Sequence, residues 1–279
     1  MTKLIKHAGI VLSAFFTLTV TPAAVVADGL NPTLNKDFTV RLGTARISGE
    51  TKVKSELDDG HEADTIDFGS LGIDGNDTST YLGARWRFSE KWRLVFESFG
   101  GTQEGTGIAQ TELDFGDLTI PVGVAAYAKI DVNVYAISLG RSFIKDETKE
   151  FGVGIGLHVA DMSVELAGAG FIDDVAVPFA SESADATAPL PSLRFFGGYA
   201  FSPEWALEAG LGLFSLTYDK YEGNMTAASV QLEWRPHDNL GVGFGYTFFD
   251  IDVKVDHDDR EDSFEYKLDG PLLYLAIGF

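Results

Sequence analysis

Period-two alternation at the end of the chain is the feature that most restricts its fold. In residues 273–279 the side chains at every second position, Leu273, Leu275, Ile277 and Phe279, are large and apolar. A period of two is typical of a β-strand whose two faces meet different surroundings. A strand that runs to an aromatic last residue is unusual for a soluble protein, whose last residues normally fray into water.

Strand-like alternation recurs from Asp37 onward and predicts an all-β domain. Tight polar connections alternate with long or acidic ones, which is typical of antiparallel strands that run up and down. We expect about ten strands, with eight as the alternative, at residues 38–48, 78–88, 92–102, 127–143, 150–164, 191–201, 205–218, 224–235, 240–254 and 264–279. The long connections are expected at residues 49–77, 103–126, 165–190, 219–223 and 256–263.

The first residues have the layout of a secretory signal peptide. Lys3 and Lys6 precede an uncharged, mostly apolar run over residues 8–20, and small residues follow it. The apolar run is shorter than the roughly 20 residues that a membrane-spanning helix needs. We therefore expect a signal peptide at residues 1–27 and one exported domain at residues 28–279. A soluble periplasmic protein is the alternative on these facts alone.

The composition argues against several classes of function. The chain has no cysteine, so it has neither disulfides nor the lipidated cysteine of a lipoprotein. Its 42 acidic and 21 basic residues give a formal net charge of −21. Nucleic-acid binding needs clustered Lys and Arg, and positive charge steers anionic substrates to an enzyme. We therefore expect neither function, and we expect no cofactor and no metal site.

The two faces of the expected strands differ in polarity. If the side of Phe279 faces outward, the opposite faces hold arginines, glutamates and many glycines, which suit a crowded polar interior. The segment 129–143 fits worst, because Arg141 shares the parity of Leu139 and Phe143, and we expect a bulge there to restore the pattern. The other outward sets carry no charge and are Leu82, Ala84, Trp86 and Phe88; Phe151, Val153, Ile155, Leu157 and Val159; Leu207, Ala209, Leu211 and Leu213; and Leu240, Val242, Phe244, Tyr246 and Phe248.

These features together resemble one protein family. The N-terminal signal, the acidic cysteine-free body, the alternating strands that end at Phe279 and the segment 154–161 are similar to the small outer-membrane β-barrel proteins of Gram-negative bacteria. The resemblance implies a single antiparallel up-and-down transmembrane barrel, porin-like and monomeric, in contact with lipid and lipopolysaccharide of the outer membrane. It also implies that the outer-membrane assembly machinery reads the strand ending at Phe279. No catalytic motif transfers to this chain.

Two tight turns carry aromatic residues on both sides. Residues 86–92 read Trp-Arg-Phe-Ser-Glu-Lys-Trp, and residues 199–205 read Tyr-Ala-Phe-Ser-Pro-Glu-Trp. Amphipathic rings prefer the membrane–water boundary, so the pattern predicts an aromatic girdle on the periplasmic side, although a soluble hairpin could carry the same pairs. The expected girdle residues are Trp86, Phe88, Trp92, Tyr199, Phe201, Trp205 and Phe279.

Charged residues on the inward faces predict an Arg/Glu network across the interior. Pairing Phe88 with Trp92 places Arg87 opposite Arg93, and like charges directly across a strand pair are destabilising unless acids compensate. An interior of ten strands lies near the size that side chains fill. The alternative is that these charges merely line water. The expected network consists of Arg85, Arg87, Arg93, Glu97, His158, Arg194, Glu208, Glu233 and Arg235.

Two of the expected loops are strongly acidic. Residues 58–64 and 256–262 offer carboxylates that suit a hard cation. Neither matches the calcium-loop motif, because Arg260 occupies an alternate position after Asp258 and the required glycine is missing. We expect solvated, self-repelling loops on the outside of the cell, with divalent cations shared with lipopolysaccharide as a weaker role.

The candidate catalytic residues of this sequence match no complete catalytic arrangement, and we expect that the protein is not an enzyme. His257, among three aspartates, resembles the Asp/His pair of some ten-stranded outer-membrane proteases. His158, Asp161 and Ser163 share a strand, but without a bulge His158 points inward and the other two point outward. The sequence favours a structural or interactive barrel with a largely filled interior and acidic loops outside. A narrow channel or transporter of small solutes is the alternative, and a hydrolase at the barrel rim is the third hypothesis.

Overall fold

Ten long antiparallel strands form a closed ring in the computed structural model, which describes residues 30–57, 65–67, 69, 77–110, 112–115, 118–172, 175–218, 220–256 and 260–279. Neighbours along the chain pair with one another, and the last strand pairs with the first. The ring consists of β1 (Phe38–Leu57), β3 (Asp77–Arg87), β4 (Trp92–Ile108), β7 (Ala125–Lys145), β8 (Lys149–Ile172), β9 (Val175–Ala200), β10 (Trp205–Tyr218), β11 (Tyr221–His237), β12 (Leu240–Asp256) and β13 (Arg260–Gly278). The prediction of an all-β up-and-down barrel of about ten strands is confirmed.

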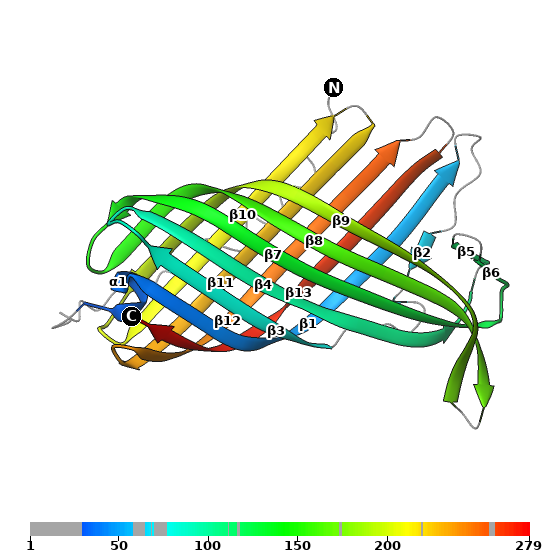
Figure 1. Cartoon of the computed structure of the whole chain (residues 1–279), viewed down its shortest axis with the longest axis horizontal. Helices are drawn as coiled ribbons and strands as arrows, with labels where there is room; N and C mark the ends of the chain where they lie inside the picture. Colours follow the sequence, from blue (N-terminus) through cyan, green and yellow to red (C-terminus); the bar gives the residue numbers. More distant parts are fainter. Residues whose placement is uncertain are drawn as a thin grey trace.

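Three short strands and one helix complete the described part of the chain. β2 (Thr65–Asp67) pairs with the far end of β1, and β5 (Leu113–Phe115) forms a hairpin with β6 (Leu118–Ile120). The helix α1 (Pro32–Asn35) is about one turn long. Figure 1 shows α1 and the C-terminus at one end of the barrel, and β5 and β6 at the other. No helix within the described ranges is long and apolar enough to cross a membrane.

The outward side chains nearest α1 form a continuous apolar band. Leu42, Phe244 and Leu273 are each more than half exposed on the outer face. Exposed apolar surface of this extent requires lipid, because soluble proteins rarely expose large contiguous apolar patches to water. Tyr135 and Tyr246 are exposed at the far edge of the band. We call the barrel from α1 to the level of these two tyrosines the membrane half, and the part beyond them the outer half.

The polarity of the two faces reverses between the halves. In the membrane half of β7, Ile137 and Leu139 face outward. In the outer half of the same strand, Val132 and Val134 are buried inside, while Asp131 lies on the outer face. The strands β8, β12 and β13 show the same reversal. Strand parity is unchanged, but the outer face now meets water instead of lipid, so the apolar side chains occupy the inner face.

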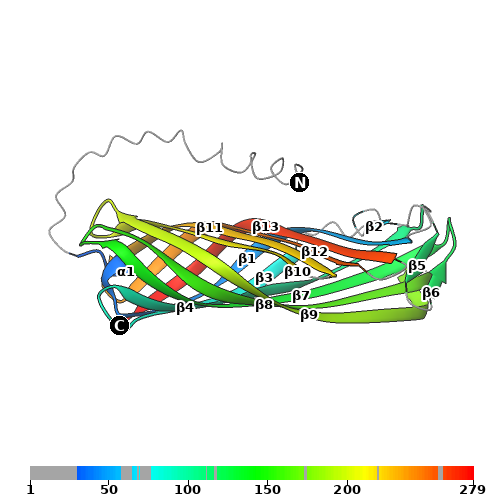
Figure 2. The same ribbon diagram turned by 90° about the horizontal axis from the view of Figure 1, so that it is seen from above.

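The ring opens into two facing sheets in the outer half. Strands β9 and β10 pair only as far as Leu193 and Leu213, and β3 and β4 only as far as Thr80 and Gly100. Beyond these points β4, β7, β8 and β9 form one sheet, while β10 to β13 and β1 form the other. Figure 1 shows the two sets of strands crossing and diverging, and Figure 2 shows the narrow side of the barrel. Pro189 lies on the stretch of β9 that β10 does not reach, where no ladder donor is required.

Several strands extend farther than the sequence predicted. Most of the expected connection at residues 165–190 is strand, because β8 continues to Ile172 and β9 begins at Val175. The strands β1, β4 and β12 also continue into expected connections. Their outer parts carry small and polar residues, and the apolar positions change face, so the alternation that defined the membrane half no longer identified them.

The bulge expected near Arg141 is present but does not turn this residue inward. The register of β7 against β8 shifts between Ser142 and Ile144, which is after Arg141. Arg141 stays on the outer face, and its guanidinium carbon lies 5.9 Å from the ring centroids of both Trp92 and Phe143. The expectation that the bulge restores the pattern is therefore wrong. A long cationic side chain at the end of a membrane strand reaches the polar interface.

Some predicted features lie outside the described residues. These are the signal peptide at residues 1–27, the acidic segment at residues 58–64, and the part of the second acidic loop at residues 257–259, which includes His257.

Candidate functional site in the barrel interior

The N-terminal segment covers the interior at the α1 end. The Asn31 side chain accepts a hydrogen bond from the Thr33 amide at 2.9 Å, and a proline follows it at the first helical position, so the helix begins there. This turn places Leu34, which is fully buried, against Ala200 and Ala206 of the barrel wall. The helix therefore seats an apolar side chain inside the ring.

Polar contacts fasten the same segment to separate strands and turns. Asn31 Nδ2 donates to the carbonyl of Ser202 at 2.9 Å, and Lys36 Nζ donates to Asn239 Oδ1 at 2.7 Å. These two partners lie in different turns, so the segment reaches from one turn to the other.

Two glutamates hold three arginines directly above α1. Arg41 Nη2 contacts the Glu208 carboxylate and lies 3.0 Å from Glu233 Oε2. Arg85 Nη1 lies 2.5 Å from Glu208 Oε1, and Arg235 Nε lies 2.7 Å from Glu233 Oε1. We call these five residues the central group. Charges buried to this degree are tolerated only when they are paired and hydrogen-bonded.

Neighbouring elements supply further acceptors and donors to the central group, although Arg85 Nε and both Nη atoms of Arg235 have no partner among the described residues. Arg85 Nη2 donates to the backbone carbonyl of Thr33, which ties the network to α1. Tyr274 Oη donates to Glu233 Oε2 at 2.9 Å. A side chain at Gly243 would place its Cβ 2.0 Å from the Tyr274 ring, so glycine is needed there to admit the tyrosine.

A second group surrounds Glu150. Arg87 and Arg93 are directly opposite across β3 and β4, as predicted. The acid that compensates them is Glu150, which accepts from Arg87 Nη1 and Nη2 at 2.9 and 2.7 Å and also from the Ser142 hydroxyl. Arg93 Nη1 is 4.0 Å from Glu150, and its guanidinium lies 3.4 Å from the centroid of the Phe196 ring. The network predicted from the sequence contained no acid beside Arg87 and Arg93.

A third layer contains His158. Arg194 Nη2 donates to Glu97 Oε2 at 3.0 Å, and Tyr81 Oη lies 3.3 Å from Glu97 Oε1. The two ring nitrogens of His158 lie 3.2 Å from Arg194 Nη1 and 3.3 Å from Ser192 Oγ. All nine residues of the predicted network therefore line the interior, but they form three groups of contacts rather than one.

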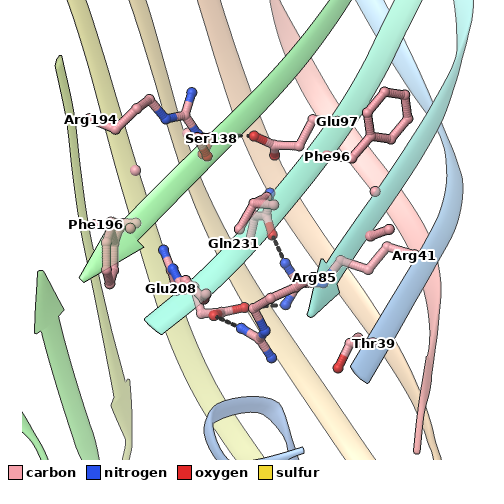
Figure 3. Close-up of a pocket in the computed structure, with 18 of the residues that line it drawn as sticks. Thr39, Arg41, Arg85, Phe96, Glu97, Ser138, Arg194, Phe196, Glu208 and Gln231 are labelled. Carbon is pink, nitrogen blue, oxygen red and sulfur yellow. Dashed lines mark hydrogen bonds and ion pairs between the residues drawn. The ribbon is translucent and has the colours of Figure 1, made fainter. Parts of the chain in front are cut away.

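A cavity of about 60 Å³ separates the central group from the Arg194 layer. Figure 3 shows Arg194 and Glu97 joined on one side of it, and Arg41, Arg85 and Glu208 gathered on the other. A cavity needs roughly 10–15 Å³ to hold a water molecule, so this cavity has room for water. It is far smaller than the pockets of about 300 Å³ or more that hold drug-sized ligands.

Apolar packing fills the interior beyond His158. The Phe249 ring lies 6.2 Å from His158 and packs edge-on against Phe99 at 5.9 Å. Leu113 and Ile120, from β5 and β6, are buried in the same cluster at the far end. The expectation of a polar interior is correct for the membrane half and wrong for the outer half. The inward residues of the outer half include Ile130, Val132, Val134, Met162, Val164, Leu166, Met225, Ile251, Tyr266 and Leu268.

Aromatic residues surround the α1 end of the apolar band. The seven predicted girdle residues lie there with partly or largely exposed rings. Trp86 packs against Phe88 at 5.5 Å between centroids, and Phe279 packs against Phe38 at 6.4 Å. Trp234, which the turn pattern did not identify, stacks on Trp205 at 6.0 Å.

Sequence reasoning missed three parts of this interior. Arg41 and Glu150 have inward parity, opposite to their exposed neighbours Leu42 and Phe151, so the face rule could have found both. The helix α1 had a weaker signal, which is the Asn-Pro pair that commonly starts a helix.

His158 is not arranged as a catalytic base. An arginine can only donate, so His158 Nε2 must accept from Arg194, and the proton of the neutral ring lies on Nδ1, facing Ser192. Ser192 Oγ is therefore an acceptor and cannot give its proton to this histidine. Asp161 lies on the outer face and accepts from the Thr187 hydroxyl at 3.1 Å, so it does not meet His158.

The outer faces of the outer half carry polar pairs. Lys129 Nζ lies 3.1 Å from Asp131 Oδ2, and the hydrogen bond that the ammonium donates to this carboxylate raises the pKa of Lys129. Tyr127 Oη lies 3.0 Å from Glu104 Oε2. Among the described residues, no group of three or more His, Asp or Glu side chains is placed to hold a metal ion.

Comparison with solved structures supports the fold. The outer membrane protease OmpT from Escherichia coli is similar over 88% of this chain and 98% of that chain, with 12% identity and a TM-score of 0.61. OprG from Pseudomonas aeruginosa (12% identity, 90% and 97% covered, TM-score 0.39) and Ail from Yersinia pestis (14%, 85% and 98%, TM-score 0.29) also match. No family model and no curated protein sequence matches. Sequence identities this low support a similar fold and nothing further.

Proposed function

We propose that this β-barrel lies in the Gram-negative outer membrane, acts through its outer surface and does not conduct solutes; its fold, which is similar to that of an outer membrane protease, and its exposed apolar band support the location. The observation that carries the proposal is that side chains obstruct the described interior at successive levels, with a cavity of about 60 Å³ between two of them. The α1 segment, the three charged groups and the apolar core of the outer half follow one another along the barrel axis.

The alternative of a narrow channel conflicts with two features. The cavity between the central group and the Arg194 layer has a volume of about 60 Å³ and is bounded by hydrogen-bonded side chains. Beyond it, a solute would have to pass a packed apolar core that contains Phe249 and Ile251, both fully buried. Opening such a core costs several kcal/mol, because each large side chain loses its buried contacts.

The outer half supplies the surface for an interactive role. Its outward faces carry polar side chains that include the acids Asp161, Glu165, Asp185, Asp250 and Glu265 and the bases Lys129 and Lys267. These faces, with the acidic loops, suit partners that are basic or are bridged by divalent cations, and the anionic headgroups of lipopolysaccharide belong to the second kind. We expect the barrel to be a monomer and not an enzyme, in keeping with the arrangement around His158.

Single-channel recording in planar bilayers tests the proposal. The wild-type barrel, and a variant that lacks residues 30–36, are both expected to show no steady conductance, because the charged groups and the apolar core remain in the second. A large-pore porin recorded in the same bilayers is the control for insertion and detection. Steady conductance of the wild type would establish the channel instead, and conductance of the deletion variant alone would make α1 the gate of a channel.

A further inference from the structure

The interior of the membrane half contains more positive than negative charge. His158 is neutral by its contacts, and Lys145, opposite Glu150 at the α1 end, adds one positive charge and donates to Asn35. The other interior charges among the described residues come from arginines and glutamates. The arginines are Arg41, Arg85, Arg87, Arg93, Arg194 and Arg235, and the glutamates are Glu97, Glu150, Glu208 and Glu233. Two guanidinium groups therefore lack a matching carboxylate. One excess charge belongs to the central group and the other to the group around Glu150.

Arg93 is the cation with the weakest compensation. Its guanidinium donates no hydrogen bond to any described residue, and its nearest carboxylate oxygen, on Glu150, is 4.0 Å away. Glu150 already accepts from Arg87 and from the Ser142 hydroxyl. One face of the guanidinium lies against the Phe196 ring, and its N–H edge has no acceptor among the described residues.

This guanidinium lines the cavity of about 60 Å³ described above. Arg85 and Arg194 line the same cavity, and Arg85 Nε is buried there without a protein partner in the described chain. The two carboxylates on the cavity wall are neutralised by their own arginines, Glu208 by Arg85 and Arg41, and Glu97 by Arg194 (Figure 3). The net field in the cavity is therefore positive.

We propose that this cavity binds one small inorganic anion of chloride size, with Arg93 as its principal ligand. An uncompensated charge in a low-dielectric interior is strongly destabilising, and a mobile counter-ion removes that cost without a further protein carboxylate. The volume admits a chloride with a few waters and excludes larger organic anions. The site is separate from the acidic outer surface, so a test of anion binding is independent of a test of the proposed function.

Bromide diffraction and chloride-dependent stability test the site. Crystals of the wild-type protein in bromide are expected to show an anomalous peak beside Arg93 in the cavity. Thermal unfolding in detergent is compared in sodium chloride and in sodium gluconate at equal ionic strength, since gluconate is too large to enter. At tenfold excess of chloride over its dissociation constant, mass action raises the unfolding temperature by about 3–6 °C.

Two variants separate the anion site from general salt effects. Arg93→Gln is expected to lose the bromide peak and the chloride-dependent shift, whereas Arg141→Gln, which removes an arginine from the outer face of the neighbouring strand, retains both. Ser138→Glu places a carboxylate on the cavity wall and is expected to abolish the chloride dependence while the protein stays folded. Water alone in the cavity, or equal unfolding temperatures of the wild type in the two salts, would overturn the proposal.

Discussion

The membrane half and the outer half of this barrel are built from the same strands with opposite polarity. Along β13, Leu273 and Leu275 face lipid while Tyr274 points into the charged interior. Farther along the same strand, Leu268 is fully buried inside and Glu265 is exposed. The surroundings of a strand, and not the strand itself, therefore decide which face is apolar. The reversal also predicts different energetic penalties for substitutions in the two halves.

The largest expected effect is the loss of an interior carboxylate from the membrane half. Glu233→Ala leaves Arg41 and Arg235 without their shared acceptor, and an uncompensated buried charge costs about 5 kcal/mol of unfolding free energy. Urea unfolding in lipid vesicles measures this loss. Glu265→Ala, on the exposed face of the outer half, is the matched control and should change stability by less than about 0.5 kcal/mol. Equal losses in both variants would remove the distinction between the halves.

The next effect concerns the apolar core of the outer half. Phe249→Ala should lower the unfolding free energy by about 4 kcal/mol, because a fully buried aromatic ring is replaced by a cavity. Phe244→Ala, on the lipid-facing side of the same strand, should cost less than half as much, since lipid chains fill the vacated space. Urea titrations of both variants give the comparison. A larger loss for Phe244 would mean that lipid contact, rather than packing, stabilises β12.

A cation on the outer face should distinguish lipid from water. Leu273→Arg places a charge on the lipid-facing side of β13 and should cost about 3 kcal/mol, as for basic residues near the bilayer midplane. Glu265→Arg, on the same side of the strand but in the outer half, should be nearly neutral. Folding yield in vesicles and urea midpoints report both. If the two substitutions cost the same, the boundary at Tyr135 and Tyr246 is misplaced.

The smallest effect is expected for a carboxylate outside both halves. Asp146, in the turn between β7 and β8, accepts from the amides of Thr148 and Lys149 at 2.9 Å, and the Thr148 contact is the main cause that lowers its pKa. A lowered folded-state pKa stabilises the protein above the ordinary pKa of an aspartate, and this contribution is lost as the pH falls through the folded value. Asp146→Asn should therefore reduce the loss of unfolding free energy on acidification by less than about 0.5 kcal/mol, because solvent screens this exposed carboxylate.

The membrane half was largely predictable from the sequence. The outward parity of Leu273, Leu275 and Ile277, read from one strand, also held for β3, β8, β10 and β12, because antiparallel pairing keeps side chains in register on one face. The arginines on the inward face followed from the same rule. Glu150 and Arg41 also have inward parity. The pattern could predict their positions near the strand ends, but it could not predict which residues they contact.

The outer half was not predictable by that rule. Its inward residues, such as Val132 and Met162, share parity with the polar interior of the membrane half, so a single assignment of faces misreads them. Which inward acid meets which arginine was equally hidden. Glu150 lies 63 residues from Arg87 along the chain and meets it only because β3 and β8 enclose the same narrow interior.

In the membrane half, the strands, their alternation and their lipid-facing side depend on local parity and on the polarity of single residues, so they follow from the amino-acid order alone. How the interior is filled depends on the folded barrel. The closing helix α1, the grouping of charges around Glu208, Glu233 and Glu150, and the apolar core around Phe249 depend on which strands face one another across the ring. That proximity is a property of the closed barrel, because it joins residues that no local pattern relates.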